Sequence, residues 1–319
     1  MRRLFKHNSK QTALLSFTHL LDAQQIATND LTKIFFLAEQ YQHEAERGVR
    51  RRHDCEGYIL ATLFFEPSTR TRFSFETAML RLGGEVISLE QGLSSSLKKG
   101  ESFADMGRVM SGYADMIVMR HPDAGSVAAF SERALVPVIN GGDGANQHPT
   151  QALADLYTIQ HEKGRLDNLT IGIIGDPKHS RTAHSLISLI SKYPGNRFIL
   201  ISHPSLRLDT RAFKQNGCEI EEVENLTQVI QELDVLYVTR IQEERFSHPE
   251  EYQEIKGRYS IRRQNLVDAK TDIILMHPLP RVNEIHPEID NLPQAKYFEQ
   301  ADCAVFVRMA LLSLLKERA

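Results

Sequence analysis

The sequence is poor in the residue types that would suggest a disulfide-stapled or zinc-binding chain. It has no tryptophan and only three cysteines, Cys55, Cys218 and Cys303, which lie far apart and form no CxxC pair. An odd number of cysteines at these spacings disfavours both a disulfide framework and a zinc site. We therefore expect reduced thiols, as in the cytoplasm.

Long apolar runs are also missing. No run approaches the roughly 18 apolar residues that a membrane-spanning helix needs. The basic residues Arg2, Arg3 and Lys6 precede a short apolar stretch, which His19 and Asp22 interrupt. This pattern predicts neither a signal peptide nor a membrane span.

Neither sign of charge dominates the chain. The formal net charge is -3, from 38 Lys and Arg against 41 Asp and Glu, so no nucleic acid or membrane surface is expected as a partner. The hydrophobic share of 41% and charged share of 25% are those of an ordinary globular protein with a sizeable core. At roughly 150 residues per domain, a chain of 319 residues is expected to form two domains.

What the sequence does contain is a repeated alternation of short apolar runs with helix-length segments. Buried strands are predicted at residues 57–65, 115–119, 136–140, 169–174, 198–202, 219–223, 235–239 and 273–276. Helices are predicted at 69–82, near Val127, at 149–163 and at 302–319. Such alternation is typical of parallel sheets covered by helices.

The predicted fold class is therefore α/β, with two doubly wound domains, each a parallel sheet covered by helices, joined by interdomain helices. We place the boundary at the start of the helix 149–163, giving a first domain of residues 1–149 and a second of 150–301. The C-terminal helix, 302–319, is expected to pack back on the first domain. In such sheets ligands bind beyond the carboxyl ends of the strands, so the chemistry is expected in the loops that follow them.

The loop after the first predicted strand has the composition of a phosphate site. It brings Ser68, Thr69, Arg70, Thr71 and Arg72 to the start of a predicted helix. Free N–H groups and the helix dipole favour an anion there, and guanidinium groups with hydroxyls suit a phosphate. The simpler alternative is a helix cap formed by Ser68 or Thr69 beside solvated arginines, but a cap needs one hydroxyl and no arginine. The cluster therefore favours phosphate binding.

Two common nucleotide-binding signatures are absent. GxxxxGK[ST] does not occur, and the chain reads Gly175-Asp176-Pro177-Lys178 where a dinucleotide fold would show GxGxxG. A P-loop hydrolase and a typical dinucleotide dehydrogenase are therefore disfavoured.

Two further loops carry polar residues after predicted strands. Arg120 follows the strand 115–119, and a glycine-rich segment follows the strand 136–140. Pro149 suits the first turn of a helix, which places His148 at the positive end of that helix. A neutral imidazole is favoured there and could donate to a carbonyl oxygen. A histidine at a helix start is as often structural, so the role of His148 stays open on this evidence alone.

Taken together, these segments resemble the aspartate and ornithine carbamoyltransferase family. The strings that carry the resemblance are FFEPSTRTR (64–72), MRHP (119–122), GDGANQHPTQ (142–151) and HPLPR (277–281). The strings occur in the order of the family, and the resemblance covers nearly the whole chain. The resemblance implies transfer of the carbamoyl group of carbamoyl phosphate to an amine.

The resemblance also implies roles for single residues at the carbamoyl-phosphate end of the site. Ser68, Thr69, Arg70 and Thr71 would hold the phosphate. The carbamoyl oxygen would be faced by Thr71, Arg120 and His148.

The other end of the carbamoyl group would be held by a second set of residues. Gln151 would lie near the carbamoyl nitrogen. Leu279 and Pro280 would form a loop that receives the carbamoyl group through backbone carbonyl oxygen, with a cis bond between them.

Two arginines favour the aspartate branch of the family over the ornithine branch. Aspartate brings two carboxylates, and Arg181 and Arg240 are predicted in loops after second-domain strands, where each could grip a carboxylate. The resemblance implies that both, with Gln242, bind aspartate. Without the family context, Arg240 would instead be a surface arginine near Glu243.

Two signatures of the ornithine enzymes are missing as well. Their Asp-x-x-Ser-Met-Gly loop does not occur, and Pro278 stands where they carry a cysteine. The implied reaction is therefore carbamoylation of L-aspartate, a step of pyrimidine biosynthesis.

The loop 94–101 has a composition that by itself favours a solvated surface loop. In the family, the matching loop reaches into the active site of a neighbouring subunit with a serine and a lysine. Ser96 and Lys99 match them, although the loop is one residue shorter than in some members. The working unit implied is at least a homotrimer with a shared active site.

No metal or organic cofactor is implied, and no ligand spacing for one is present. A transferase for another amine, such as ornithine, and a non-catalytic scaffold homologue remain as alternatives. Whether regulatory chains or a dihydroorotase bind the trimer is left open by the sequence. His179 departs from the family pattern in a loop expected between the domains.

Overall fold

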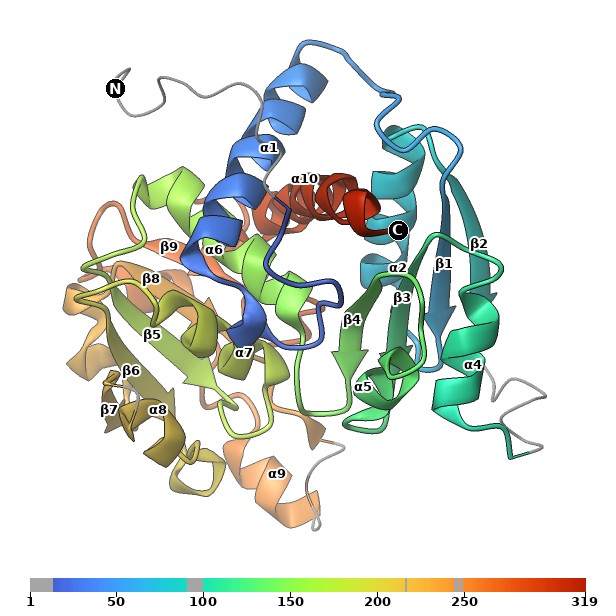
Figure 1. The fold of residues 1–319 in the computed structure, drawn as a ribbon. Helices are drawn as coiled ribbons and strands as arrows, with labels where there is room; N and C mark the ends of the chain where they lie inside the picture. Colours follow the sequence, from blue (N-terminus) through green and yellow to red (C-terminus); the bar gives the residue numbers. More distant parts are fainter. Residues whose placement is uncertain (1–13, 91–99, 216, 244–245, 247–248) are drawn as a thin grey trace.

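The chain folds into two parallel β-sheets with helices around and between them (Figure 1). The structure, a computed structural model, describes residues 14–90, 100–215, 217–243, 246 and 249–319. Within these ranges, the first sheet has four strands in the order β2-β1-β3-β4 and the second has five in the order β7-β6-β5-β8-β9. The predicted fold class is confirmed.

All paired strands run parallel, as the strand–helix alternation predicts. In the first sheet the strands are β1 (Ile59–Phe64), β2 (Glu85–Glu90), β3 (Met116–His121) and β4 (Val138–Asp143). In the second sheet they are β5 (Thr170–Gly175), β6 (Arg197–Ser202), β7 (Glu219–Val223), β8 (Val235–Val238) and β9 (Ile274–Met276). In both sheets the order reverses beside the first strand, which leaves a crevice at the carboxyl ends.

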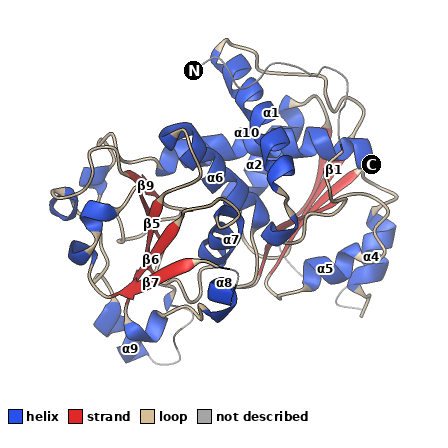
Figure 2. Cartoon of the chain, turned by 60° about the vertical axis from the view of Figure 1, so that its left-hand side comes forward, coloured by secondary structure: helices blue, strands red, loops and turns tan. Residues whose placement is uncertain are grey.

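A central group of helices lies between the two sheets (Figures 1 and 2). Helix α10 contacts α1, α2 and α6, and α6 also contacts α7. The helices are α1 (Thr28–Glu46), α2 (Thr69–Arg81), α4 (Phe103–Met110), α5 (Ser126–Ser131), α6 (Pro149–Lys163), α7 (Arg181–Ile190), α8 (Arg211–Gln215), α9 (Pro249–Ile255) and α10 (Tyr297–Leu315). None of the helices in the described ranges is long and apolar enough to cross a bilayer.

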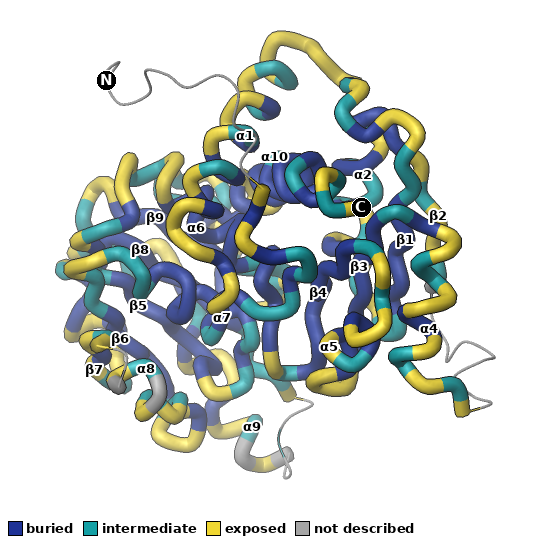
Figure 3. The backbone as a smooth tube through the Cα atoms, viewed as in Figure 1, coloured by how far each residue is buried: buried dark blue, intermediate teal, exposed yellow. Residues whose placement is uncertain are grey.

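Both faces of the central strands of each sheet are buried, which explains why strands such as β1, β3, β5 and β8 read as continuous apolar runs. Along β1, Leu60 packs into the central core and Ala61 into the cluster under α4 and α5. Along β8, Tyr237 and Leu236 alternate in the same way between the central core and an outer cluster. The central core contains residues of both sheets, so one continuous buried layer joins them (Figure 3).

The structure corrects several predicted boundaries. Strands β3 and β4 continue to His121 and Asp143, so Arg120 lies inside a strand rather than in the loop after it. Helix α10 begins at Tyr297, five residues before the predicted start at Asp302. Strand β2 and helix α1 were not predicted.

A close approach between β5 and the end of β8 provides a test of this packing. Gly175 has φ +113°, and a Cβ there would lie 2.2 Å from the backbone oxygen of Thr239. Gly164, after α6, also has positive φ (+68°), but nothing lies within 4 Å of its added Cβ.

We predict that Gly175→Ala lowers the free energy of unfolding by about 3 kcal/mol or more, because strain and a backbone clash add. The matched control Gly164→Ala should cost about 1 kcal/mol, from the left-handed backbone alone. Urea unfolding of both variants measures the difference. Equal costs would contradict the described contact.

Candidate active site

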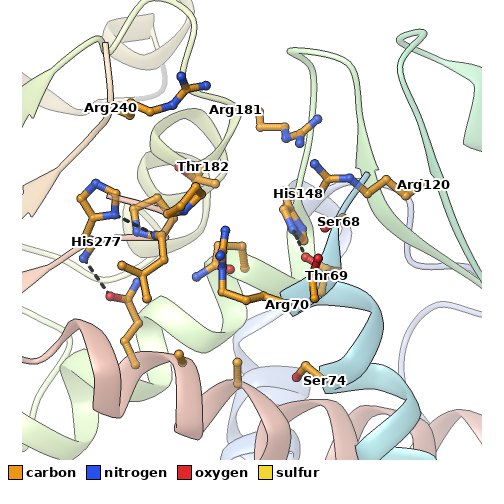
Figure 4. A pocket seen from close by; sticks show the side chains of 18 of the residues that line it. Ser68, Thr69, Arg70, Ser74, Arg120, His148, Arg181, Thr182, Arg240 and His277 are labelled. Atoms are coloured by element: carbon orange, nitrogen blue, oxygen red, sulfur yellow. Dashed lines mark hydrogen bonds between the residues drawn. The ribbon is translucent and has the colours of Figure 1, made fainter. Parts of the chain in front are cut away.

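A cavity of about 850 Å³ lies between the two sheets, at the carboxyl ends of their strands (Figure 4). Residues from the loop before α2, from β3, from the starts of α6 and α7, from the loops after β8 and β9 and from α10 line it together. It brings together most of the predicted site residues: Ser68, Thr69, Arg70, Thr71, Arg120, His148, Gln151, Arg181, Arg240, Gln242, Leu279 and Pro280. Ser96 and Lys99 lie outside the described residues.

The start of α2 presents open hydroxyls to this cavity. Ser68 occupies the N-cap position, yet its side chain makes no capping hydrogen bond, so the capping alternative is wrong for Ser68. Thr69 is the first helical residue, and Arg70 follows it into the cavity wall. Partial burial lowers the pKa of Arg70 from its ordinary value. Helix N–H groups, a hydroxyl that is not used for capping and a partly desolvated guanidinium therefore meet at one point, as an anion site requires.

Glu66 links arginines that come from the two sheets. Its Oε1 lies 2.6 Å from Nη2 of Arg120, on β3, and 3.1 Å from Nη2 of Arg181. Arg181 opens α7 rather than lying in the preceding loop, and its Nη1 donates to the backbone oxygen of Gly144. Burial, and then the nearby Arg181, lowers the pKa of Arg120 to about 10, against the effect of Glu66. One carboxylate thus serves two guanidiniums.

Positive charge exceeds negative charge in the cavity. Among the described lining residues, Glu66 is the acidic one, whereas the arginines are Arg70, Arg120, Arg181, Arg240 and Arg308. Like charges at close range repel strongly where water is excluded. Bound anions would therefore stabilise the excess positive charge of the cavity.

His148 stands where α6 begins and is buried, with 4% of its surface exposed. Its backbone N–H donates to Oγ of Ser185, and its Nε2 lies 3.5 Å from Oγ1 of Thr71. Nδ1 has no hydrogen-bond partner within the described part of the chain. Burial, then Arg120 and other guanidiniums, hold the pKa of His148 well below its ordinary range. The imidazole is therefore neutral, as predicted from its position on the helix.

The second-sheet side of the cavity carries Arg240 (Figure 4). Gln242, in the same loop after β8, also lines the cavity. Gln242 Nε2 donates to the backbone oxygen of His179 at 3.1 Å. The His179 ring lies 3.0 Å from the fully buried Asp176 carboxylate. These contacts tie the loop before α7 to the loop after β8 and leave both facing the cavity.

The loop after β9 forms the remaining wall. The peptide bond between Leu279 and Pro280 is cis, as the family resemblance implies. Sequence reasoning gave no role to Glu66 or Arg308, although both line the cavity. Arg308 is 3% exposed; its Nη1 donates to Oγ of Ser74 at 2.6 Å, and burial lowers its pKa to about 10. Glu66 lies inside the family-like string 64–72 and could have been found there. Arg308 is a single arginine on the apolar helix α10, and nothing in the sequence around it indicates a functional site.

Burial of neutral histidines makes stability depend on pH. Burial also lowers the pKa values of His184 and His277. Below the unfolded-state pKa of about 6.5, the unfolded chain binds protons that the native chain does not. The free energy of unfolding therefore decreases as the pH is lowered. Asp155 acts in the opposite sense below about pH 6, because burial raises its pKa to about 6.

We predict that His148→Gln makes the free energy of unfolding less sensitive to pH between 6.5 and 5.5, by up to about 1.4 kcal/mol per pH unit. The contribution of Asp155 is the same in both proteins and cancels in the comparison. Urea unfolding at several pH values measures both slopes. Identical slopes would mean that His148 is protonated in the native protein.

Comparison with known proteins extends the argument from the site to the family. The aspartate/ornithine carbamoyltransferase carbamoyl-P binding domain matches residues 18–161, and the Asp/Orn binding domain of the same family matches residues 167–315. The aspartate carbamoyltransferase catalytic subunit of Alkaliphilus metalliredigens is 48% identical over 300 residues, covering 93% of this chain and 96% of the relative. That of Archaeoglobus fulgidus is 50% identical over 295 residues, covering 92% and 98%.

Solved structures agree. The catalytic subunit of M. jannaschii aspartate transcarbamoylase superposes with a TM-score of 0.87 at 47% identity, covering 94% of this chain and 98% of that one. Aspartate transcarbamoylase from Trypanosoma cruzi, in complex with carbamoyl phosphate, gives 0.86 at 35% identity, covering 95% and 97%. The chain described here belongs to the aspartate/ornithine carbamoyltransferase family.

Proposed function

We propose that this chain is the catalytic chain of an aspartate carbamoyltransferase, which joins carbamoyl phosphate to L-aspartate and releases N-carbamoyl-L-aspartate and phosphate. The observation that carries the proposal is the arrangement of cations in one cavity. Arg70 stands with open hydroxyls at the start of α2, and Arg181 and Arg240 stand on the second-sheet side. Such a cavity suits a phosphate at one end and a dicarboxylate at the other.

The acceptor follows from charge and from relatives. Ornithine would bring an amine where the cavity already has an excess of guanidiniums, whereas aspartate brings two carboxylates. The Trypanosoma cruzi relative has been solved in complex with carbamoyl phosphate and aspartate, and with N-(phosphonacetyl)-L-aspartic acid. Arg181, Arg240 and Gln242 are the proposed aspartate residues.

We assign one substrate to each of the two domains, and each domain contains one of the two sheets. Residues 1–149 form the carbamoyl-phosphate-binding domain and residues 150–301 the aspartate-binding domain. The C-terminal helix belongs with the first domain, a placement supported by the contacts of α10 with α1 and α2. The cavity between the sheets is then where the two substrates meet.

The mechanism needs positioning and electrostatics more than proton transfer by side chains. The neutral amine of aspartate attacks the carbamoyl carbon, a C–N bond forms, and the C–O bond to phosphate breaks; the departing phosphate takes the amine proton. Thr71, Arg120 and neutral His148 face the carbamoyl oxygen as it gains negative charge. Arg70 stabilises the phosphate. Holding both substrates in one cavity places the amine next to the carbamoyl carbon, which lowers the entropic part of the activation barrier.

The assembly is part of the same proposal. Ser96 and Lys99 of the loop 94–101 complete the site of a neighbouring subunit, with Lys99 contacting both substrates, so the enzyme works as a homotrimer in the cytoplasm. Regulatory chains or a dihydroorotase are candidate further partners. Arg181 already contacts Glu66 in the loop before α2, so domain closure would chiefly bring Arg240 toward that loop.

Phosphate release by the purified full chain tests the reaction and acceptor together. Release from carbamoyl phosphate that depends on L-aspartate and not on L-ornithine is expected. Release with ornithine would overturn the acceptor assignment, and release with neither amine would favour a non-catalytic homologue.

Arg70→Ala is predicted to abolish most activity while the protein remains folded, because the phosphate loses charge-assisted hydrogen bonds. Such bonds contribute about 1.5–3 kcal/mol each, which corresponds to about a ten- to hundredfold loss of kcat/KM. Circular dichroism and steady-state kinetics measure fold and rate. A folded variant with full activity would remove Arg70 from the phosphate site.

Arg240→Ala is predicted to raise KM for aspartate about tenfold or more and to leave KM for carbamoyl phosphate within about twofold. Arg211→Ala is the matched control, since Arg211 is an exposed arginine paired with Asp209 outside the cavity. Equal changes in both KM values would show that Arg240 does not act at the acceptor end.

A further inference from the structure

A buried carboxylate behind the cavity binds side chains from three elements. Asp155 lies on α6 with 0% of its surface exposed. Its Oδ1 accepts from Nε2 of Gln151 at 2.7 Å and from Nε2 of Gln300, on α10, at 2.6 Å. Its Oδ2 accepts from the hydroxyl of Tyr237, on β8, at 2.8 Å. One group therefore connects α6, α10 and the second sheet.

These bonds decide which end of each amide faces Asp155. Burial raises the pKa of Asp155 to about 6, against its hydrogen bonds and Arg308, so at neutral pH it is a carboxylate. A carboxylate only accepts, and therefore each glutamine must turn its NH2 group toward it. The carbonyl oxygen of Gln151, which lines the cavity, is then turned away from Asp155.

The second glutamine extends the network to the wall formed by the loop after β9. Gln300 Oε1 accepts from the backbone N–H of His277 at 2.9 Å. His277 Nδ1 accepts from the backbone N–H of Leu279 at 2.7 Å, and its Nε2 lies 2.8 Å from Oε1 of Glu284. Leu279 has φ +53°, a left-handed conformation that a leucine keeps only where its surroundings impose it. Asp155 thus supports both the Gln151 amide and the Leu279 backbone.

We propose that Asp155 is a positioning residue that makes the site selective for a carbamoyl phosphate over other acyl phosphates. It does so by holding Gln151 Oε1 and the Leu279 loop as acceptors for the NH2 group of the donor substrate. This inference rests on the proposed function, since it concerns the carbamoyl end of the same cavity.

The selectivity follows from the chemistry of the two donors. Acetyl phosphate has a methyl group where carbamoyl phosphate has NH2, and it is otherwise nearly the same size. A site with fixed acceptor oxygens leaves them unpaired when the methyl group enters, which costs affinity. A site whose glutamine side chains are free to rotate can present either the NH2 group or the carbonyl oxygen. Such a site discriminates less between the two donors.

The test uses two substitutions at position 155. Asp155→Leu fills a similar volume and offers no acceptor. Asp155→Asn keeps one oxygen, which can accept from both glutamines, while its NH2 can donate to the oxygen of Tyr237. Calorimetric titration without acceptor measures Kd for carbamoyl phosphate, acetyl phosphate and inorganic phosphate in each full-length protein.

The wild type is expected to bind carbamoyl phosphate about tenfold or more tighter than acetyl phosphate. In Asp155→Leu this ratio should fall to about one to three, because carbamoyl phosphate alone binds more weakly, while Kd for inorganic phosphate stays within about twofold. Asp155→Asn should keep the ratio within about threefold of the wild type. A retained ratio in Asp155→Leu, a lost ratio in Asp155→Asn, or equal weakening of all three ligands would each overturn the proposal.

Gln300→Met supplies the same test if Asp155→Leu does not fold, since it releases the His277 loop without removing a buried charge. It should lower the carbamoyl-to-acetyl ratio by at least about threefold, and an unchanged ratio contradicts the proposal. The proposed function fails separately, if the wild type shows no aspartate-dependent phosphate release from carbamoyl phosphate. An active wild type with unchanged ratios in folded variants removes only the role of Asp155.

Discussion

The repulsion between guanidinium groups in one partly buried cavity is the interaction on which the rest of the site depends. Arg120 and Arg181 share a single carboxylate oxygen of Glu66, and burial, Arg181 and then Arg70 lower the pKa of Arg120. Concentrated positive charge of this kind is costly without bound anions. Burial, and then the same positive charge, lowers the pKa of His148 and keeps its ring neutral, which suits it to donate to a carbonyl oxygen. Substrate anions would supply the missing negative charge.

The fold brings these cations together because its two sheets point their carboxyl ends at one cavity. Arg120 reaches it from β3, Arg181 from the start of α7, and Arg240 from the loop after β8. Helices α6 and α10 pack between the sheets and carry Gln151, Asp155 and further polar groups along the base of the cavity. A continuous apolar core thus holds these helices in place, while ion pairs through Glu66 connect β3 with the start of α7.

Much of this architecture could be predicted from the sequence, and the exceptions have physical causes. Buried parallel strands such as β1 and β8 are continuous apolar runs, so they are readily detected. Strand β2 lies at the edge of its sheet, and Glu85, Ser88 and Glu90 interrupt its apolar residues, so no such run exists. Helix α1 does carry apolar residues at helical spacing, including Leu31, Ile34 and Ala38, and could have been predicted.

The polar residues of the site divide in the same way. Those in family-like strings, such as Ser68, were predicted. Only the structure shows that the Ser68 side chain makes no capping hydrogen bond. Asp155 was not predicted, because its partners Tyr237 and Gln300 lie 82 and 145 residues away in the chain. An aspartate on a helix ordinarily indicates a solvated face, so only the tertiary structure shows that this one is buried.

The central claim is that one cavity binds a phosphate group at one end and two carboxylates at the other. The most direct test compares two ligands that share the phosphonate end and differ in the carboxylates. N-(phosphonacetyl)-L-aspartate carries a phosphonate and two carboxylates, whereas phosphonacetamide keeps the phosphonate and the amide but lacks the carboxylates. If one cavity binds both charged ends at once, calorimetry should show the first ligand binding about a hundredfold or more tighter than the second. Equal affinities would contradict the account, because the arginines of the second sheet would then contribute nothing to binding.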